Sequence, residues 1–290
     1  MGKFGKNGAY PMKQRVISSA VGLILLAVVL ALFDTIVVNI VVALLAWLAV
    51  YEMFSATGCW NFRPLSIPAT IFAIAIPFLS SRLLSRVIPL TCYLYVLVLF
   101  SVLLRNHKKI HVEQVAVVFT FSLMIPFSLS TLVYQRDWNG TTLGIFYVLL
   151  SLGSAWLSDT GAYFAGHAFG KHKLAPVISP KKTVEGAIGG MIFADFAMLL
   201  ISWMYSLASA AAGYPIQIHY LAIACIMPFL SAVSIVGDLS ASIVKRQFGV
   251  KDYGSIMPGH GGVMDRFDSA LMVAPLVYII SRYLPLAVLA

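Results

Sequence analysis

The sequence predicts an all-α, polytopic membrane protein with about nine transmembrane helices. Hydrophobic residues make up 60% of the 290 residues, and charged residues only 11%, whereas soluble domains carry roughly 25% charged residues. A soluble fold of this size cannot bury that much apolar surface, so lipid must contact much of it. Apolar runs of about 20 residues recur along the chain, which is the length that a helix needs to cross a bilayer.

Nine apolar segments are the predicted spans. They lie near residues 16–33, 36–53, 65–81, 87–104, 114–134, 142–158, 184–208, 217–236 and 267–287. A very short turn around Asp34 joins the first two, which predicts a tight helical hairpin. Pro68, Pro77, Pro126 and Pro228 lie inside spans, where we expect them to kink the helices.

The distribution of lysine and arginine predicts the orientation. With the N-terminus in the cytoplasm and nine spans, 16 of the 20 basic residues lie on the cytoplasmic side and the C-terminus lies outside. We therefore expect a multi-pass protein of the cell (plasma) membrane. Residues 1–135 would form an N-terminal group of transmembrane helices, and residues 136–290 a C-terminal catalytic region.

Two long, polar, glycine-rich segments, 159–183 and 237–266, are predicted to be cytoplasmic. Only four of the 11 acidic residues precede residue 159. Polar residues concentrated at one membrane face indicate a functional site, so we expect the active site at the cytoplasmic face of the C-terminal half.

The first polar segment begins with Asp159, which ends an apolar span and has no basic residue in its own turn. If this stretch is helical, Asp159, Tyr163, Gly166 and Gly170 share one face, and the glycines allow a ligand to approach closely. The alternative is that the two glycines form a small-residue contact between helices and that Asp159 is a solvated helix end.

Ser179 and Pro180 resemble the N-cap and first position of a helix. Lys181 and Lys182 would then lie in the first turn, where the helix dipole disfavours cations. A bound anion such as phosphate would remove that conflict. The alternative is that both lysines are anchors at the cytoplasmic surface.

The second polar segment contains paired carboxylates. Asp265 and Asp268 are three residues apart at the start of the last span and are expected to face the same way. Their repulsion would be offset by a divalent cation, and carboxylate oxygens suit Mg²⁺. Asp238 ends the preceding span on the same side and is a candidate third ligand.

Basic side chains and a flexible loop accompany these acids. The charge that a polyphosphate requires would come from Lys245, Arg246, Lys251 and Arg266. Residues 258–262, Pro-Gly-His-Gly-Gly, can bring backbone close to a ligand, with His260 as a contact to phosphate or base. The alternative is an ordinary cytoplasmic loop with ion pairs.

These motifs resemble the CDP-diacylglycerol synthase family, also called phosphatidate cytidylyltransferases. The matching positions are Ser242, Lys245-Arg246, Lys251-Asp252, 258–262 and Asp265-Arg266-Phe267-Asp268, together with the runs 159–163, 170–176 and 179–183. The resemblance is close over about residues 155–275. Ala241 and Lys181 depart from it, at positions where the family often has Glu and Gly.

The resemblance implies that CTP and phosphatidic acid react at the bilayer to give CDP-diacylglycerol and pyrophosphate, with Mg²⁺ assisting an in-line attack on the CTP α-phosphorus. It assigns catalysis to Asp238, Asp265, Asp268, Lys245, Arg246 and Arg266, the three aspartates being metal ligands. It assigns substrate binding to Asp159, Lys171, Lys173, Ser179, Lys181, Lys182, Thr183, Ser242, Lys251, Asp252, His260, Gly261 and Gly262. A second cation and a homodimer are compatible with it, and no nucleic acid is expected.

Two other function classes compete with this interpretation. A transporter or channel should carry polar residues in the middle of its spans, whereas here they gather at one face. Another lipid-phosphate enzyme would show different motifs: the Asp-Gly-x-x-Ala-Arg pattern of CDP-alcohol phosphatidyltransferases is absent, as are the Ser-Gly-His and Arg-His elements of histidine-dependent lipid phosphatases.

Overall fold

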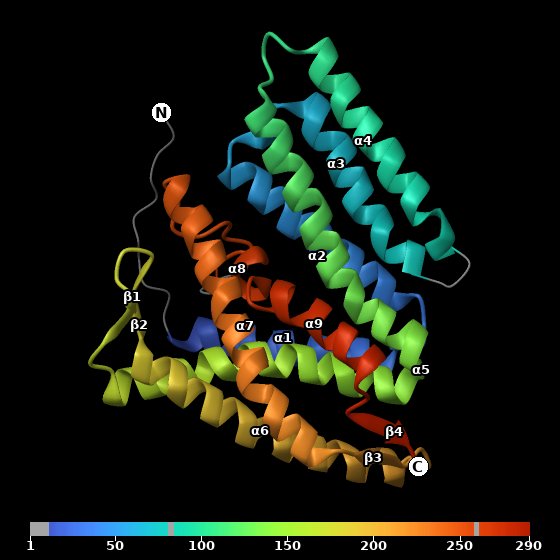
Figure 1. Cartoon of the computed structure of the whole chain (residues 1–290), viewed down its shortest axis with the longest axis vertical. Coiled ribbons are helices and arrows are strands. Elements are labelled where there is room, and N and C mark those ends of the chain that lie inside the picture. The colour runs from blue at the N-terminus through green and yellow to red at the C-terminus, as the bar shows by residue number, and fades with distance from the viewer. Residues whose placement is uncertain (1–11, 81–83, 258–260) are drawn as a thin grey trace.

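The protein is a bundle of long helices with two short strand pairs (Figure 1). The computed structural model describes residues 12–80, 84–257 and 261–290. The helices are α1 (Met12–Ala31), α2 (Val37–Ala56), α3 (Arg63–Ala75), α4 (Ile88–Arg105), α5 (Val112–Phe169), α6 (Val184–Ala211), α7 (Tyr220–Gln247), α8 (Met264–Phe267) and α9 (Ala270–Tyr283). Short 3-10 turns lie at Cys59–Asn61, Ile76–Ser80 and Leu84–Val87.

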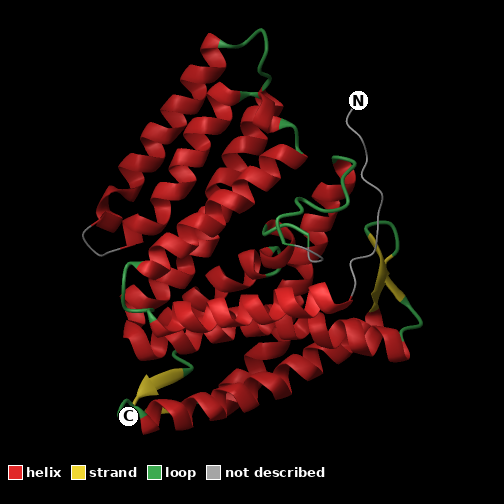
Figure 2. Cartoon of the chain, turned by 180° about the vertical axis from the view of Figure 1, so that it is seen from behind, coloured by secondary structure: helices red, strands yellow, loops and turns green. Residues whose placement is uncertain are grey.

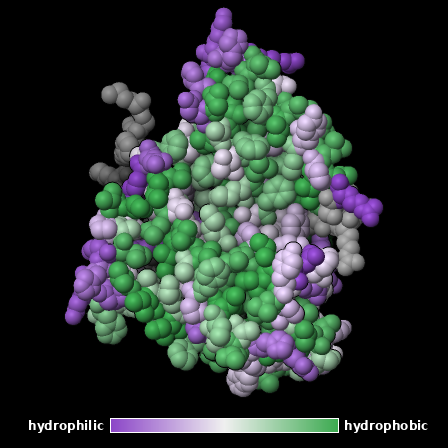
Figure 3. Space-filling model, viewed as in Figure 1, coloured by the Kyte–Doolittle hydropathy of each residue, from purple (hydrophilic) through white to green (hydrophobic). Residues whose placement is uncertain are grey.

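The helices confirm an all-α membrane protein. Five of the described helices, α2, α4, α5, α6 and α7, are long and apolar enough to cross a bilayer, and shorter apolar helices lie at Ala20–Ala31, Arg63–Leu79 and Ala270–Tyr283. The count of nine spans and their orientation remain predictions. Large apolar side chains point outward along these helices, among them Leu44, Ile71 and Phe196. Figure 3 shows apolar residues across most of one face, with hydrophilic residues at its margins.

Helix α5 is two helices joined at Gly140. Its 58 residues would extend about 87 Å if straight, far more than a bilayer's thickness. At Gly140 the backbone adopts φ 76° and ψ −179°, a conformation that favours glycine. The two arms turn sharply there (Figure 1), and they correspond to the predicted spans 114–134 and 142–158.

Helix α5 is the centre of the packing, because α2, α6, α7 and α9 all contact it. Small residues allow close approach to α6. A Cβ atom on Gly161 would lie 2.6 Å from Cβ of Phe193, and one on Gly190 would lie 2.9 Å from Cβ of Ala162. These close contacts hold the end of α5 that carries Asp159 against α6.

Two antiparallel strand pairs supplement the helices and lie at opposite ends of the molecule (Figure 2). Strand β1 (Lys173–Ala175) pairs with β2 (Ser179–Thr183) between α5 and α6. Strand β3 (Ile216–Ile218) pairs with β4 (Ala287–Leu289), next to a hydrogen bond from Leu286 N to the Tyr147 hydroxyl at 2.9 Å. Short strands were not expected from the apolar pattern.

The β1–β2 hairpin corrects the predicted start of α6. Ser179 and Pro180 are not a helix cap, because they lie in β2. The helix begins at Val184, and the Thr183 side chain caps it by accepting a hydrogen bond from Gly186 N at 3.1 Å. Lys181 and Lys182 therefore lie before the first turn, and the predicted conflict between these lysines and the helix dipole does not arise.

Glu185 holds the base of this hairpin. Its carboxylate accepts hydrogen bonds from Lys171 N at 3.0 Å and from His172 N at 3.1 Å, and it contacts the His172 ring at 2.6 Å. An acid in the first turn also suits the helix dipole. The hairpin is thus fixed at the end of α5 and the start of α6, which determines where Lys182 points.

Candidate active site

Three carboxylates from separate elements lie close together, and two of them are beside Lys182. Asp159 lies in α5, Asp238 in α7, and Asp268 between α8 and α9. Lys182, on β2, forms an ion pair with Asp238 Oδ2, and its Nζ lies 3.9 Å from Asp159 Oδ1. Ser269 Oγ donates a hydrogen bond to Asp159 Oδ2 at 3.1 Å. The fold therefore brings both predicted polar segments together.

The three carboxylates interact with one another as well as with basic groups. Asp268 is only 7% exposed, and it interacts electrostatically with Asp238, Lys245 and Asp159. No set of three or more His, Cys, Asp or Glu side chains in the described part of the chain is arranged to hold a metal by itself. A cation at this cluster would therefore take some of its ligands from a bound substrate.

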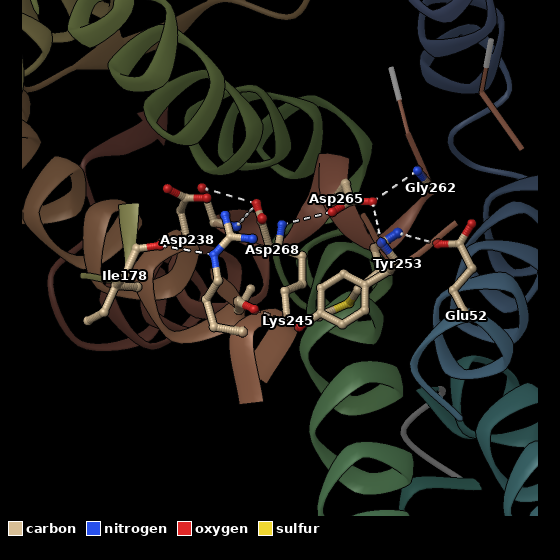
Figure 4. A network of polar contacts seen from close by, with 12 residues as sticks. Glu52, Ile178, Asp238, Lys245, Tyr253, Gly262, Asp265 and Asp268 are labelled. Atoms are coloured by element: carbon tan, nitrogen blue, oxygen red, sulfur yellow. Dashed lines mark hydrogen bonds and ion pairs between the residues drawn. The ribbon is translucent and has the colours of Figure 1, made fainter. Parts of the chain in front are cut away.

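Asp265 has partners of its own within the protein. Lys245 Nζ donates to Asp265 Oδ1 at 2.8 Å, while the backbone amides of Tyr253 and Gly262 donate to Oδ2 at 2.9 Å and 3.0 Å. The side chain is only 5% exposed. Figure 4 shows Lys245 between Asp265 and Asp268. The two aspartates thus have different surroundings, although they are three residues apart.

Lys245 and Tyr253 contact each other next to Asp265. The Lys245 ammonium lies 5.2 Å from the centroid of the Tyr253 ring. The Tyr253 hydroxyl donates to Ala241 O at 2.8 Å. Burial raises the pKa of the Tyr253 phenol, and the nearby Asp265 carboxylate raises it further, so the phenol stays neutral and keeps donating. These contacts fix Tyr253 to the end of α7.

The glycine-rich loop is closed by its own backbone. Met257 N donates to Gly261 O at 2.9 Å, and Gly261 has φ 86°, which favours glycine. Gly262 follows and donates to Asp265. His260, which was expected to contact phosphate or base, lies outside the described residues.

The remaining residues predicted for the site differ in their contacts and in their exposure. Arg246 Nε donates to Ile178 O at 3.4 Å, linking α7 to the hairpin. Arg266 O accepts a hydrogen bond from Trp156 Nε1 at 3.1 Å. Ser242 and Thr183 are buried, Ser179 is half-buried, and the exposed positions are Lys171, Lys173, Lys181, Lys251 and Asp252. Their roles remain predictions.

Sequence reasoning missed three residues of the site: Ser269, Tyr253 and Glu52. Glu52 lies in α2 and is 2% exposed, and its Oε2 accepts a hydrogen bond from Met264 N at 2.8 Å. In the sequence, Glu52 shares the feature that singled out Asp159: it is an acid near the end of an apolar span. Ser269 and Tyr253 gave no such signal.

A sequence model of the family described as "Cytidylyltransferase family" matches residues 13–284, which is most of the chain. The chain belongs to the cytidylyltransferase family. Its resemblance to CDP-diacylglycerol synthases is confirmed by relatives named phosphatidate cytidylyltransferase. The one from Staphylococcus saprophyticus is 46% identical over 137 residues, covering 47% of this chain and 49% of the relative.

A second relative of that name, from Bacillus subtilis, is 43% identical over 135 residues, covering 47% of each chain. A third, from Staphylococcus aureus, is 42% identical over 137 residues, covering 47% of this chain and 49% of the relative. The chain spans about half the length of the curated relatives it matches. Membership of the cytidylyltransferase family favours an enzyme over a transporter or channel.

Proposed function

We propose that this protein makes CDP-diacylglycerol and pyrophosphate from CTP and phosphatidic acid. The observation that carries the proposal is the cluster of Asp159, Asp238 and Asp268, with Lys182 beside the first two and Lys245 near the third, in a chain of the cytidylyltransferase family. A lipid and a nucleotide, both carrying phosphate, need a site with cations at a membrane face. The other lipid-phosphate enzymes weighed from the sequence have no such support.

The cluster fits a divalent cation of the Mg²⁺ type. Mg²⁺ is usually held by one or two carboxylates plus substrate phosphates and water, so a complete set of protein ligands is not required. We propose that Asp238 and Asp268 hold it, with Asp159 beside them. The Lys182 ammonium supports this assignment, because it already places positive charge between Asp159 and Asp238. When bound, the cation would offset negative charge on the phosphates.

Asp265 was predicted to be a third metal ligand, and we now propose a different role for it. Both of its oxygens accept hydrogen bonds from protein donors, Lys245 on one side and two backbone amides on the other. Such a carboxylate has little capacity left for a metal. Its proposed task is to hold the Lys245 ammonium and the glycine-rich loop in place.

The chain's own residues would bind and orient the two phosphates. Lys182 and Lys245 supply positive charge at the cluster, and Arg246, Lys251 and Arg266 add to it. A phosphatidate oxygen forms a bond to the CTP α-phosphorus, while the bond to the bridging oxygen breaks and pyrophosphate leaves. Phosphatidate is already an anion at neutral pH, so no protein nucleophile is needed. A second cation and a homodimer remain predictions.

Nucleotide choice tests this proposal. With phosphatidate in mixed micelles and Mg²⁺, CTP is expected to give CDP-diacylglycerol at least about 100-fold faster than ATP or GTP, because a site that hydrogen-bonds one base rejects others strongly. The measurement is the rate of nucleotide-lipid formation for each triphosphate. Similar rates with all of them would contradict a cytidylyltransferase.

We also propose that segments 159–183 and 237–266 face the cytoplasm in the cell (plasma) membrane. The test uses a variant without Cys59, Cys92 and Cys225, with single cysteines at the exposed positions Lys171 or Ser255. An impermeant thiol reagent is expected to label neither position in intact cells and both after lysis, because these segments lie inside. Labelling from outside would reverse the orientation.

A further inference from the structure

Glu52 is a buried acid from the N-terminal half that contacts the active-site loop. It precedes Met264 by 212 residues, yet its Oε2 accepts the Met264 N–H at 2.8 Å. Met264 begins α8, the single turn that carries Asp265. Figure 4 shows the Glu52 carboxylate facing the segment that holds Gly262 and Tyr253. Helix α2 therefore takes part in forming the site.

The loop is shaped to fit this carboxylate. A Cβ atom on Gly254 would lie 2.6 Å from Glu52 Cδ, and one on Gly262 would also lie 2.6 Å from it. A side chain at either position would therefore force the Glu52 carboxylate to move. The absence of a side chain at both positions lets the two ends of the 254–262 stretch close around one carboxylate from another helix.

Stability alone does not explain an acid at this position. The Glu52 Oε1 atom is buried and makes no well-formed hydrogen bond among the described residues, although the backbone amide of Val263 also interacts with the carboxylate. Burying a carboxylate oxygen without a donor is costly, and apolar residues often replace buried ionic groups with no loss of stability. The buried Glu52 carboxylate therefore has a role that an apolar side chain cannot fill.

That role follows from the neighbours of Met264. Gly262 N donates to Asp265, which also accepts from Lys245, and Lys245 lies close enough to Asp268 to interact with it electrostatically. Two carboxylates, those of Glu52 and Asp265, thus hold the short stretch 262–264 from opposite sides. A shift in this stretch would move the Lys245–Asp265 pair and, through α8, Asp268.

We propose that Glu52 is a positioning residue for nucleotide turnover, acting through the backbone of residues 262–264. The inference rests on the proposed function and extends it to α2. A misplacement of about 1 Å at a catalytic group can lower the rate about 100-fold, so the effect of losing Glu52 should be large.

Two substitutions separate positioning from general structure. Glu52→Ala is expected to lower kcat/KM for CTP about 100-fold and to speed hydrogen exchange of the amides of residues 253–257 and 261–264. Glu52→Gln keeps a carbonyl oxygen that can accept the Met264 N–H, so it should recover most of the activity and protection. Glu113→Gln, at an exposed acid in the first turn of α5, is the control and should match the wild type.

A paired substitution tests the contact from the loop side. Gly254→Ala should lower the melting temperature in the wild type, because the added methyl group meets the Glu52 side chain, and should cost less in a Glu52→Ala background, where space is free. Equal costs in both backgrounds would contradict the contact.

The positioning role would be overturned if Glu52→Ala left loop exchange or kcat/KM for CTP unchanged, or if Glu52→Gln were as damaging as Glu52→Ala. If the wild-type protein made no CDP-diacylglycerol, that result would contradict the proposed function instead. The exchange and melting measurements do not depend on turnover, so the two failures are distinguishable.

Discussion

Replacing Asp268 or Asp238 by Asn will abolish turnover and leave the protein folded. The amide keeps the shape of the side chain but loses the charge that a divalent cation requires. Losing a metal ligand removes several kcal/mol of transition-state stabilisation, on the order of 10³-fold in rate. In the cation-free protein the change at Asp268 relieves repulsion from Asp238 and Asp159, so the melting temperature should hold or rise. Asp238→Asn also removes the ion pair with Lys182, so its melting temperature should fall slightly.

Specific activity, its Mg²⁺ dependence and the melting temperature should be measured together for each variant. Asp34→Asn, at an exposed acid in the turn between α1 and α2, is the matched control and should match the wild type in all three. Variants at Asp238 or Asp268 that melt early yet keep normal activity and Mg²⁺ response would refute the metal-ligand assignment.

Unlike the substitutions at Asp238 and Asp268, Asp265→Asn is expected to cause a large loss of stability. The carboxylate accepts from Lys245 and two backbone amides and is almost fully buried. Removing one partner of a buried ion pair leaves the other charge uncompensated and costs about 3–5 kcal/mol. The melting temperature should therefore fall well below that of Asp268→Asn, and activity should fall because loop and lysine are displaced.

A second variant separates the ion pair from metal binding. Replacing Lys245 by Met together with Asp265→Asn removes both charges, so it should recover part of the lost stability without recovering activity. An Asp265→Asn protein with an unchanged melting temperature and a lost Mg²⁺ response would instead make Asp265 a metal ligand, as the sequence predicted.

The helices could be predicted from the sequence because each apolar run is long enough to cross lipid, and every predicted span coincides with described helix for most of its length. The β1–β2 hairpin could not. Ser179-Pro180 carries the same local signal as a helix N-cap, and the strand forms through non-local pairing of Lys173 with Thr183. The break at Gly140 was predicted only as a connection between two spans.

The site could be predicted where side chains shared one proposed membrane face. That argument placed Asp159, Asp238, Asp265 and Asp268 at one membrane face, and the fold places Asp159, Asp238 and Asp268 in one cluster. It did not predict the partners of Asp265, because two of them are the backbone amides of Tyr253 and Gly262, which leave no mark in the sequence. It did not connect Glu52 with the site, although that acid also ends an apolar span, because the residue lies 212 positions before its partner.

The most direct test of the central claim follows the label of two radioactive CTP samples in the presence of phosphatidate and Mg²⁺. Attack at the α-phosphorus predicts that label from [α-³²P]CTP appears in the lipid, that label from [γ-³²P]CTP appears in pyrophosphate, and that both transfers stop without a divalent cation. Label from [γ-³²P]CTP in the lipid, or release of free phosphate alone, would contradict the account.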